Sequence, residues 1–362
     1  MAFEGYYLYS ANLSRLFERN HYFDDTIPKY VIVMALLVLL WFVLYFLGRR
    51  SKKSHHNKAG QMLLIVCLVL VTVFPLAGQL IHMSQNGEFF DGYYIAYEAK
   101  TEDGTCAVVD IEAWPGVKTI EIPETLGEYK VTELEWKAFR FCADLETLKV
   151  PASVNYVSFV MSESMYNDHC KNLRNIYIED LAAWCAIDFE SNPLYELPGQ
   201  VYLNGELLTD LVIPEDVTQI KQGVFVNRTC LTSLTVGKDV TEIGDYAFKN
   251  CTALTSVTMG ENVTSIGASA FEGCTSLTSI ELDNVTTIGF SAFEDCKSLR
   301  SVTIGKNVNS TGTRMFAGCT SLTSITYTGT MAQWEDMPKI EGWNSGVPAT
   351  QVVCSDGVVA LN

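Results

Sequence analysis

A single pattern recurs along the second half of the chain. Between residues 208 and 327 nearly the same sequence is written five times, and two complete copies read CTALTSVTMGENVTSIGASAFEG and CTSLTSIELDNVTTIGFSAFED. The period is 23 residues with one step of 22, measured between the phenylalanines at Phe225, Phe248, Phe271, Phe293 and Phe316. A unit this short cannot bury its own apolar face, so we predict that the copies stack against one another. The repeat constrains the fold more tightly than the function.

Each unit opens with three apolar residues in the spacing L-x-x-L-x-L. Alternation over the last three positions is the period of a β-strand, and identical short strands would pair in parallel at about 4.8 Å per strand. The sequence therefore predicts a mainly β repeat solenoid with a ribbon of parallel strands. Nine apolar rows are present: Val117, Ile120, Ile122; Leu145, Leu148, Val150; Leu173, Ile176, Ile178; Leu208, Leu211, Ile213; Leu231, Leu234, Val236; Leu254, Val257, Met259; Leu277, Ile280, Leu282; Leu299, Val302, Ile304; and Leu322, Ile325, Tyr327.

The rest of each unit carries a second apolar pair, such as Val263 and Ile266, and ends in Ala-Phe-x-x-Cys. We expect the Phe to fill the interior opposite the first strand. Between residues 151 and 171 the Ile-Gly and Ala-Phe signals are missing, which predicts a distorted unit there. An interruption of this kind is either a binding surface or sequence drift.

Two long uncharged stretches precede the repeats. Residues 30–47 and 62–81 are 18 and 20 residues long, and at about 1.5 Å per residue each reaches the thickness of a hydrocarbon core. We predict two transmembrane helices, an α-helical hairpin ahead of the solenoid; the alternative is a pair of buried core helices. The connector holds five Lys or Arg residues in ten, which predicts a cytoplasmic loop and a two-pass protein of the cell membrane with its repeat domain extracytoplasmic.

These assignments divide the chain into seven parts. The predicted boundaries are 1–28 for an extracytoplasmic N-terminal tail, 29–48 for transmembrane helix 1, 49–60 for a basic cytoplasmic loop, 61–82 for transmembrane helix 2, 83–116 for a linker and N-terminal cap, 117–330 for the repeats with an insertion near 181–206, and 331–362 for a C-terminal cap.

Charge is distributed unevenly along the chain. Up to His82 there are 8 Lys or Arg against 4 Asp or Glu, a net charge of +4, and beyond it 17 against 38, a net charge of −21. A repeat region this acidic repels phosphate backbones, so we exclude a nucleic-acid partner. Cationic partners and bound calcium stay open, as does the simpler explanation that the acidity keeps the solenoid soluble.

The segments AFEGCTSLTSI and ENVTSIG resemble the BspA-type leucine-rich repeat family. The resemblance covers about residues 117 to 330 and implies surface display and binding or adhesion, with no ligand shared by all members. Two other stretches resemble segments that accompany such repeats, namely LAAWCAIDFESNPLY and TGTMAQWEDMPKIEGWNSG followed by VVCSDGVV. In this interpretation Trp334 and Trp343 close the exposed apolar end of the stack.

The cysteines follow the repeat. Six of the 11 occupy one repeat slot and Cys230 lies near it. Residues in one slot of adjacent units point the same way and fit the torsion of a disulfide poorly, so we predict a ladder of buried thiols rather than a disulfide framework. Cys106, Cys185 and Cys354 lie off the ladder and are the candidates for bridging. The six slot residues are Cys142, Cys170, Cys251, Cys274, Cys296 and Cys319.

Catalytic and metal-binding constellations are weak. Beyond His82 the only histidine is His169, which leaves no His-based metal cage there. The neighbouring Cys170 has a repeat-slot explanation, and neighbours on a strand point apart, so we do not assign a dyad. No catalytic motif is present, and we predict no enzyme activity, no catalytic residue, no metal and no cofactor.

The residues between the strand hydrophobics are expected to face outward on the concave ribbon, where a ladder of hydroxyls can hydrogen-bond an extended peptide or a glycan. The alternative is that Ser and Thr simply suit solvent-facing strands. The candidate ligand-binding residues are Ser256, Thr258, Ser279, Glu281, Ser301, Thr303, Ser324 and Thr326.

The pattern as a whole predicts a membrane-anchored cell-surface repeat protein that binds an extracellular protein or glycan partner, as in adhesion, without catalysis. The alternative is a scaffold or regulatory subunit of a membrane protein complex, in which the hairpin contacts another membrane protein. A partner that co-purifies stoichiometrically from detergent would favour the subunit.

Overall fold

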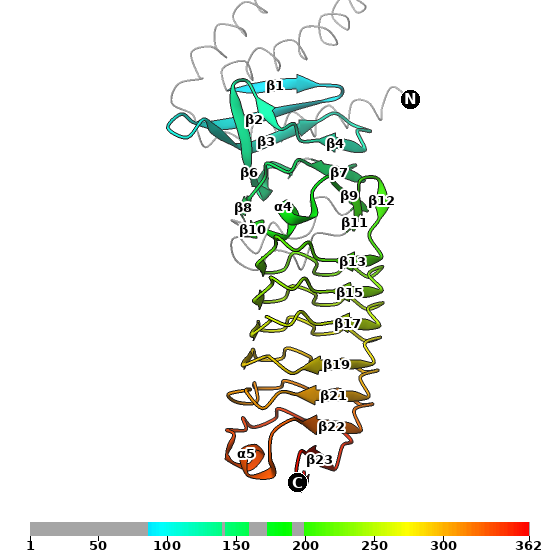
Figure 1. Ribbon diagram of the computed structural model, residues 1–362. Coiled ribbons are helices and arrows are strands. Elements are labelled where there is room, and N and C mark those ends of the chain that lie inside the picture. Colours follow the sequence, from blue (N-terminus) through cyan, green and yellow to red (C-terminus); the bar gives the residue numbers. More distant parts are fainter. Residues whose placement is uncertain (1–85, 140–141, 159–171, 190–198, 362) are drawn as a thin grey trace, which may run out of the picture. The chain divides into compact units, whose positions relative to one another are not determined.

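Two short strands in each repeat determine the architecture. The computed structural model describes residues 86–139, 142–158, 172–189 and 199–361. In most repeats a first strand and a second strand lie on different sides of the interior, and they pair with the equivalent strands of neighbouring repeats (Figure 1). After residue 300 the second strand is reduced to an isolated bridge between Thr311 and Lys339. The repeats therefore stack into a β solenoid, as the sequence predicts.

The first strands of the repeats lie along one side of the solenoid in three sheets, and within each sheet they run in parallel and in register, as where Leu234 lies opposite Val257. We call these strands the ribbon and their outward surface the ribbon face. Each of the nine predicted apolar rows contributes one of them. The ribbon strands are β4 (Thr119–Glu121), β7 (Thr147–Val150), β9 (Asn175–Ile178), β11 (Gln200–Leu203), β13 (Asp210–Val212), β15 (Ser233–Thr235), β17 (Ser256–Thr258), β19 (Ser279–Leu282), β21 (Ser301–Ile304), β22 (Ser324–Tyr327) and β23 (Gln351–Cys354).

Two of these strands, β11 and β23, are absent from the sequence prediction. Their sequences, QVYL and QVVC, have Pro198 and Ala349 at the position where the other rows begin with Leu or Val. They nevertheless pair in parallel with the preceding ribbon strand, with Val201 opposite Ile176 and Val352 opposite Ile325. Register with a neighbouring strand therefore places them, although the repeat signature does not mark them.

The second strands form another parallel row, which we call the second row. In the later repeats each member is only two residues long, and Gly follows it at residues 244, 267 and 289. A Cβ atom at Gly289 would lie 2.4 Å from the backbone nitrogen of Ala268, so the close approach of two rungs requires glycine there. The row consists of β6 (Tyr129–Glu135), β8 (Tyr156–Ser158), β10 (Asp188–Phe189), β14 (Gln219–Ile220), β16 (Glu242–Ile243), β18 (Ser265–Ile266) and β20 (Thr287–Ile288).

The first described residues add antiparallel strands to the second row. β1 (Gly87–Phe90), β2 (Tyr93–Lys100) and β3 (Thr105–Ala113) form an antiparallel meander, and β3 then pairs in parallel with β6. The short β5 (Thr125–Leu126) pairs antiparallel with β6, and a 3₁₀-helix, η1 (Trp136–Phe139), follows it. The buried side chains of this region join the same apolar core as the repeats.

Two short helices each precede a β-hairpin. Helix α4 (Leu181–Cys185) is capped by Asp180, and helix α5 (Met331–Asp336) by Thr330, whose hydroxyl accepts a hydrogen bond from the Gln333 amide. After α4 the strand β11 turns back into β12 (Glu206–Leu207), and after α5 the strand β23 turns back into β24 (Gly357–Ala360). The two helix-and-hairpin modules thus share the order of helix and hairpin, and they differ in that a second-row strand lies between helix and hairpin only in the first.

A column of phenylalanine rings forms the centre of the later repeats. Phe225, Phe248, Phe271, Phe293 and Phe316 are buried, with adjacent ring centroids 5.3 to 5.5 Å apart and interplanar angles of 1° to 22°. At the end of the column Trp343 lies edge-on to Phe316, and Trp334 packs against Trp343. Both indoles are buried, so aromatic packing continues past the last phenylalanine.

The predicted transmembrane hairpin is wrong as part of the fold class. No helix of the described residues is long and apolar enough to cross a membrane, since α4 and α5 have five and six residues. This finding also contradicts the predicted two-pass location in the cell membrane. The apolar residues of the described chain recur at strand spacing and fill the solenoid interior instead of forming an uninterrupted helical run. Residues 29–48, 49–60 and 61–82 themselves lie outside the described residues, as does most of the distorted unit, at 159–171.

Phe271→Ala tests the central column. Removing a ring that contacts one neighbour on each side should lower the free energy of unfolding by roughly 3 to 5 kcal/mol, because a cavity remains. The matched control is Phe290→Ala in the adjacent unit, where the side chain is 54% exposed, and it should change stability by less than about 0.5 kcal/mol. Chemical denaturation measures both. Equal losses in the two variants would mean that the column does not hold the stack together.

Candidate binding face

The eight predicted ligand-binding residues lie on ribbon strands and form two columns on the ribbon face. Ser279, Ser301 and Ser324 stand opposite one another in register. Two residues further along the same strands, Glu281, Thr303 and Thr326 are also in register with one another. Ser256 and Thr258 occupy the same positions on β17, exposed to solvent. The residues between the columns, such as Ile280 and Val302, are buried. The geometry brings the eight side chains together on one surface; whether they bind a ligand is a proposal taken up below.

A neighbouring column of threonines behaves differently. The hydroxyls of Thr232, Thr255 and Thr278 each donate a hydrogen bond to the carbonyl oxygen of the threonine 23 residues earlier, at 3.1, 3.0 and 3.3 Å. Thr241 and Thr264 make the same bond beside the second row. These hydroxyls link one rung to the next, so they serve the stack itself.

The eight candidate residues have no such role. Within the part of the chain that the structure describes, none of their side chains forms a hydrogen bond or ion pair, and all are exposed or half-buried. Serine and threonine hydroxyls each carry a donor and acceptor lone pairs. The ribbon face therefore presents a regular array of polar groups whose hydrogen-bonding capacity is available to a ligand.

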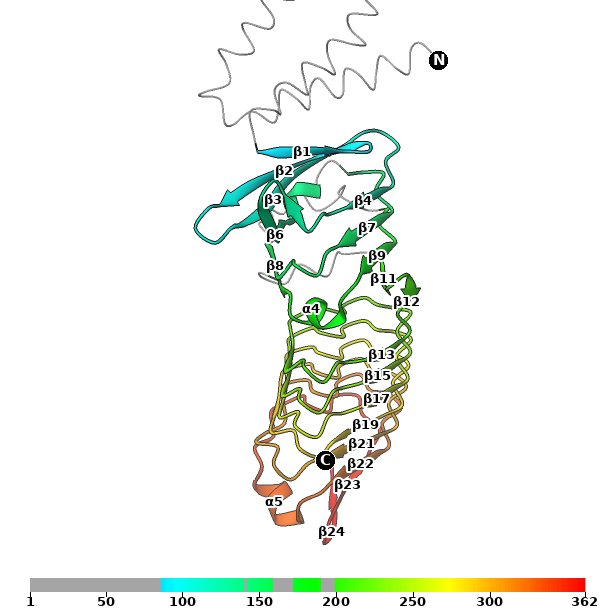
Figure 2. The same ribbon diagram turned by 45° about the horizontal axis from the view of Figure 1, so that its top comes forward.

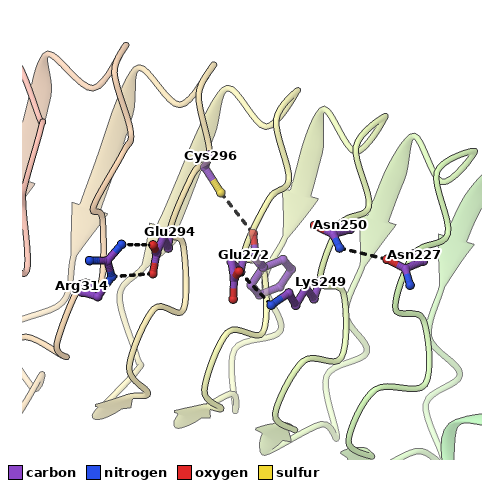
Figure 3. Close-up of polar contacts among 8 residues, drawn as sticks. Asn227, Lys249, Asn250, Glu272, Glu294, Cys296 and Arg314 are labelled. Carbon is purple, nitrogen blue, oxygen red and sulfur yellow. Dashed lines mark hydrogen bonds and ion pairs between the residues drawn. The ribbon is translucent and has the colours of Figure 1, made fainter. Parts of the chain in front are cut away.

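We call the surface that carries Lys249, Asn250, Glu272, Glu294 and Arg314 the turn side of the solenoid. Its polar groups are paired with one another (Figure 3). The Lys249 ammonium lies 2.8 Å from a Glu272 carboxylate oxygen, and Asn250 donates to the Asn227 side chain at 3.0 Å. Arg314 forms a two-bonded ion pair with Glu294. Because these charges neutralise each other in the free protein, the turn side is less suited than the ribbon face to bind a charged or polar partner.

One acidic residue at the start of β13 was not among the predicted site residues. Asp210 accepts hydrogen bonds from the hydroxyls of Ser233 at 2.6 Å and Thr232 at 3.1 Å. These hydrogen bonds lower the pKa of the Asp210 carboxyl below its usual value, and the bond from Ser233 has the largest effect. Asp210 therefore stays ionised on the ribbon face, in the column that continues through Ser233 to Ser256, and only the outcome of strand pairing identifies it.

Sequence reasoning also missed several exposed apolar groups on the ribbon face. Tyr177 and Tyr202 stack with ring centroids 4.7 Å apart and an interplanar angle of 14°. Leu207, opposite Tyr202 across the hairpin, is 39% exposed. On the second hairpin Val353 and Val358 lie opposite each other and are 42% and 51% exposed. The alternation in NIYI and QVYL was the available signal for the two tyrosines.

The predicted thiol ladder is confirmed for the described cysteines, all of which are free. In the later repeats each ladder thiol donates to the carbonyl oxygen of the phenylalanine in the preceding unit, for example Cys296 to Phe271 at 3.2 Å (Figure 3). The thiol of Cys142 instead donates to the Ile111 carbonyl oxygen at 3.8 Å. Burial raises the pKa of the Cys251 thiol to about 12. Cys106, Cys185 and Cys354, the predicted bridging candidates, are likewise free and buried. The bonds equivalent to that of Cys296 are Cys251 to Phe225, Cys274 to Phe248 and Cys319 to Phe293, at 3.1 to 3.2 Å.

The ladder slot of the first regular unit holds arginine instead of cysteine. Arg228, three residues after Phe225, takes that place, and Cys230 lies off the ladder with its thiol bonded to the Leu208 carbonyl at 3.6 Å. Arg228 is buried and donates to the Gly199 carbonyl oxygen at 2.5 Å. Burial lowers the pKa of its guanidinium to about 10. Arginine thus joins this unit to the chain leading into β11, where the other units have a thiol.

The described residues contain no cluster of three or more His, Cys, Asp or Glu side chains that could hold a metal ion. The pair His169 and Cys170 lies outside the described residues.

The sequence profile of the BspA type leucine rich repeat region matches the chain in six copies, over residues 116–253 and 218–337. These ranges include more than half of the 362 residues. The chain belongs to the BspA-type leucine-rich repeat family. The resemblance stated from AFEGCTSLTSI and ENVTSIG is therefore confirmed, and the solenoid is a leucine-rich repeat solenoid.

Solved bacterial repeat proteins are similar over most of their length. A leucine rich cell surface protein from Faecalibacterium prausnitzii is 18% identical, with 70% of this chain and 97% of that chain covered and a TM-score of 0.37. The pneumococcal vaccine antigen PcpA is 16% identical, with 74% and 98% covered and a TM-score of 0.38. A leucine-rich repeat protein from Bacteroides ovatus is 18% identical, with 70% and 100% covered and a TM-score of 0.31. No curated protein matches the sequence at a significant level.

Alkylation tests the thiol ladder of this family member. With iodoacetamide near pH 8.5, the buried ladder thiols should stay protonated and unmodified in the folded protein, because burial raises their pKa and blocks access. Cys230 is half-buried and should react first among the described cysteines. In denaturant all should react, since a free thiol has a pKa near 8.5. Peptide mass spectrometry reads the sites, and native modification of Cys296 at the unfolded rate would contradict the ladder.

Proposed function

We propose that this BspA-type protein is a non-catalytic binding protein that attaches to a protein or glycan partner through its ribbon face, as an adhesin does. One observation carries the proposal. Hydroxyls beside the ribbon face are used in bonds between rungs, whereas the hydroxyls of Ser256, Ser279 and Thr303 on the face make no bond within the described chain. A repeated polar surface that the fold does not need for its own stability is suited to a partner.

The affinity of such a face comes from many weak contacts acting together. One hydrogen bond to an uncharged hydroxyl contributes only about 0.5 to 1.5 kcal/mol in net terms. Stacked repeats multiply that contribution, because each added rung presents the same groups in register with the last. Single substitutions on the ribbon face should therefore have small effects, and several rungs must be changed together.

The net charge of the molecule limits the charge that its partner can carry. The whole chain has a net charge of −17, and Glu281 places a carboxylate in the middle of the ribbon face. A basic partner is attracted to this surface and an anionic polymer is repelled, whereas the net charge does not disfavour a neutral partner. Salt should weaken the attraction to a basic partner.

The test replaces three outward residues together, as Thr258→Lys, Glu281→Lys and Thr303→Lys. Three positive charges would then stand in the central rungs of the ribbon face, while the inward residues stay unchanged. The variant should keep its far-ultraviolet circular dichroism spectrum. Ligands that the wild type binds on a random-sequence peptide array or a glycan array should lose tenfold or more in affinity, equivalent to about 1.4 kcal/mol.

A matched control lies on the second row. Glu242→Lys, Ser265→Lys and Thr287→Lys alter one Glu, one Ser and one Thr that are also in register on adjacent strands. The triple control makes the same change in net charge on a different side of the solenoid. It should keep the wild-type affinity within about twofold. Equal losses in both triple variants, or no binding by the wild type on either array, would contradict the proposed function.

A further inference from the structure

The two helix-and-hairpin modules both place apolar residues in the columns of the ribbon face. In each module a ribbon strand leads through a capped helix with a buried Trp to a hairpin, whose first strand pairs in parallel with that ribbon strand. The sequences NIYIEDLAAW and SITYTGTMAQW show the shared order of strand, cap and helix. One module lies among the repeats and the other follows the last of them (Figure 2).

At one outward register position both hairpins place an apolar pair, whereas five of the six ribbon strands between them, β15 to β22, place Thr or Glu. The sixth, β13, is the first ribbon strand after the first hairpin and has Val212 there, 62% exposed. Tyr202 and Leu207 form the pair on β11 and β12, and Val353 and Val358 form the pair on β23 and β24. The register puts Val353 opposite Thr326, so the second pair continues a column of the ribbon face. We call these two pairs the anchor pairs.

Core packing does not explain the anchor pairs. Their strand neighbours Val201 and Val352 point inward and are buried, at 2% and 0% exposure, so the alternation of the strand turns the anchor pairs outward. A single exposed hydrophobic residue is ordinary. Here the same outward register position is apolar in both modules, on either side of five ribbon strands, β15 to β22, that have Thr or Glu there.

We propose that the two anchor pairs hold the apolar side chains of one extended, basic polypeptide that crosses the ribbon strands between them. This inference rests on the proposed function of the ribbon face. Six ribbon strands, β13, β15, β17, β19, β21 and β22, lie between the hairpins, which separates the pairs by on the order of 30 Å at about 4.8 Å per strand. An extended chain covers that distance with about nine residues.

The shape of the anchor pairs favours a polypeptide over a glycan. Tyr177 and Tyr202 cover one face of each other's ring, at 4.7 Å and 14°, and Leu207 stands opposite Tyr202. Aliphatic side chains offer no hydrogen bonds to sugar hydroxyls, but they bury the apolar side chains of a peptide well. Glu281 and Asp210, both on ribbon strands between the pairs, favour basic residues in the spacer.

Synthetic peptides test the spacing. The first carries Leu-Tyr-Leu at each end of a nine-residue spacer of alternating Lys and Ser, and the second has the same composition with the two clusters four residues apart. If both anchor pairs bind one chain, the wild type should prefer the first peptide by at least tenfold, since the second cluster then binds intramolecularly. Fluorescence anisotropy measures both affinities. Equal affinities, or no binding of the first peptide at about 100 μM, would overturn the proposal.

Variants of each anchor pair locate the contacts. Tyr202→Ser with Leu207→Ser should abolish the preference for the longer spacer, and so should Val353→Ser with Val358→Ser, because either change leaves one anchor. These side chains are largely outside the core, and circular dichroism checks that both variants fold. Retention of the preference in either variant would overturn the proposal.

A control double variant, Phe290→Ser with Ile340→Ser, removes two residues that are 54% and 43% exposed away from the ribbon strands. It should bind both peptides like the wild type, and an equal loss here would show that general hydrophobicity, not the anchor pairs, holds the peptide.

The triple lysine variant of the ribbon face separates this inference from the proposed function. If the variant with Lys at residues 258, 281 and 303 loses the longer peptide while both anchor variants bind it like the wild type, the ribbon face is a binding face and the anchor pairs are not part of it. If the triple variant binds that peptide unchanged, the proposed function itself fails.

Discussion

Contact between successive rungs is the interaction on which the rest of the structure depends. A unit of 23 residues has one ribbon strand, in most repeats one strand of the second row, and one phenylalanine of the central column, and none of these is buried without its neighbours. The rings stack at 5.3 to 5.5 Å, thiols bond to phenylalanine carbonyls, as Cys296 does to Phe271, and threonines bond to threonine carbonyls. Every stabilising contact is therefore repeated along the solenoid, and so is every surface position.

That repetition explains why one face is available for binding. The interior uses the phenylalanines and thiols, one column of threonines links the rungs, and the turn side pairs its own charges, as Lys249 does with Glu272. The eight candidate residues in the columns of the ribbon face, among them Ser279 and Thr303, have no such role in the described chain, whereas in an earlier rung Ser233 bonds to Asp210. The helix-and-hairpin modules interrupt these columns with apolar residues, so the two ends of the polar face differ chemically from its middle.

Much of this arrangement was predictable because the repeat is local in sequence. The phenylalanine column, the thiol ladder, the nine ribbon strands and the outward position of residues such as Glu281 all follow from spacing. Strands β11 and β23 were not predictable, because pairing with β9 and β22 places them while their own sequences lack the repeat signature. Arg228 in the cysteine slot was also missed, because Cys230, two residues later, resembled the expected thiol. The membrane hairpin was wrong, because hydrophobic length alone led to an assignment that no described helix supports.

The central claim is that the partner lies on the ribbon face. Hydroxyl-radical footprinting of the protein, alone and saturated with a ligand selected on the peptide or glycan array, measures it directly, because labelling reports the solvent exposure of individual side chains. The account predicts reduced labelling of Tyr202, Leu207, Val353 and Val358 and unchanged labelling of Phe290, which is also exposed in the free protein, at 54%, but lies off the ribbon strands. Reduced labelling of Phe290 with no change at the ribbon residues would contradict it.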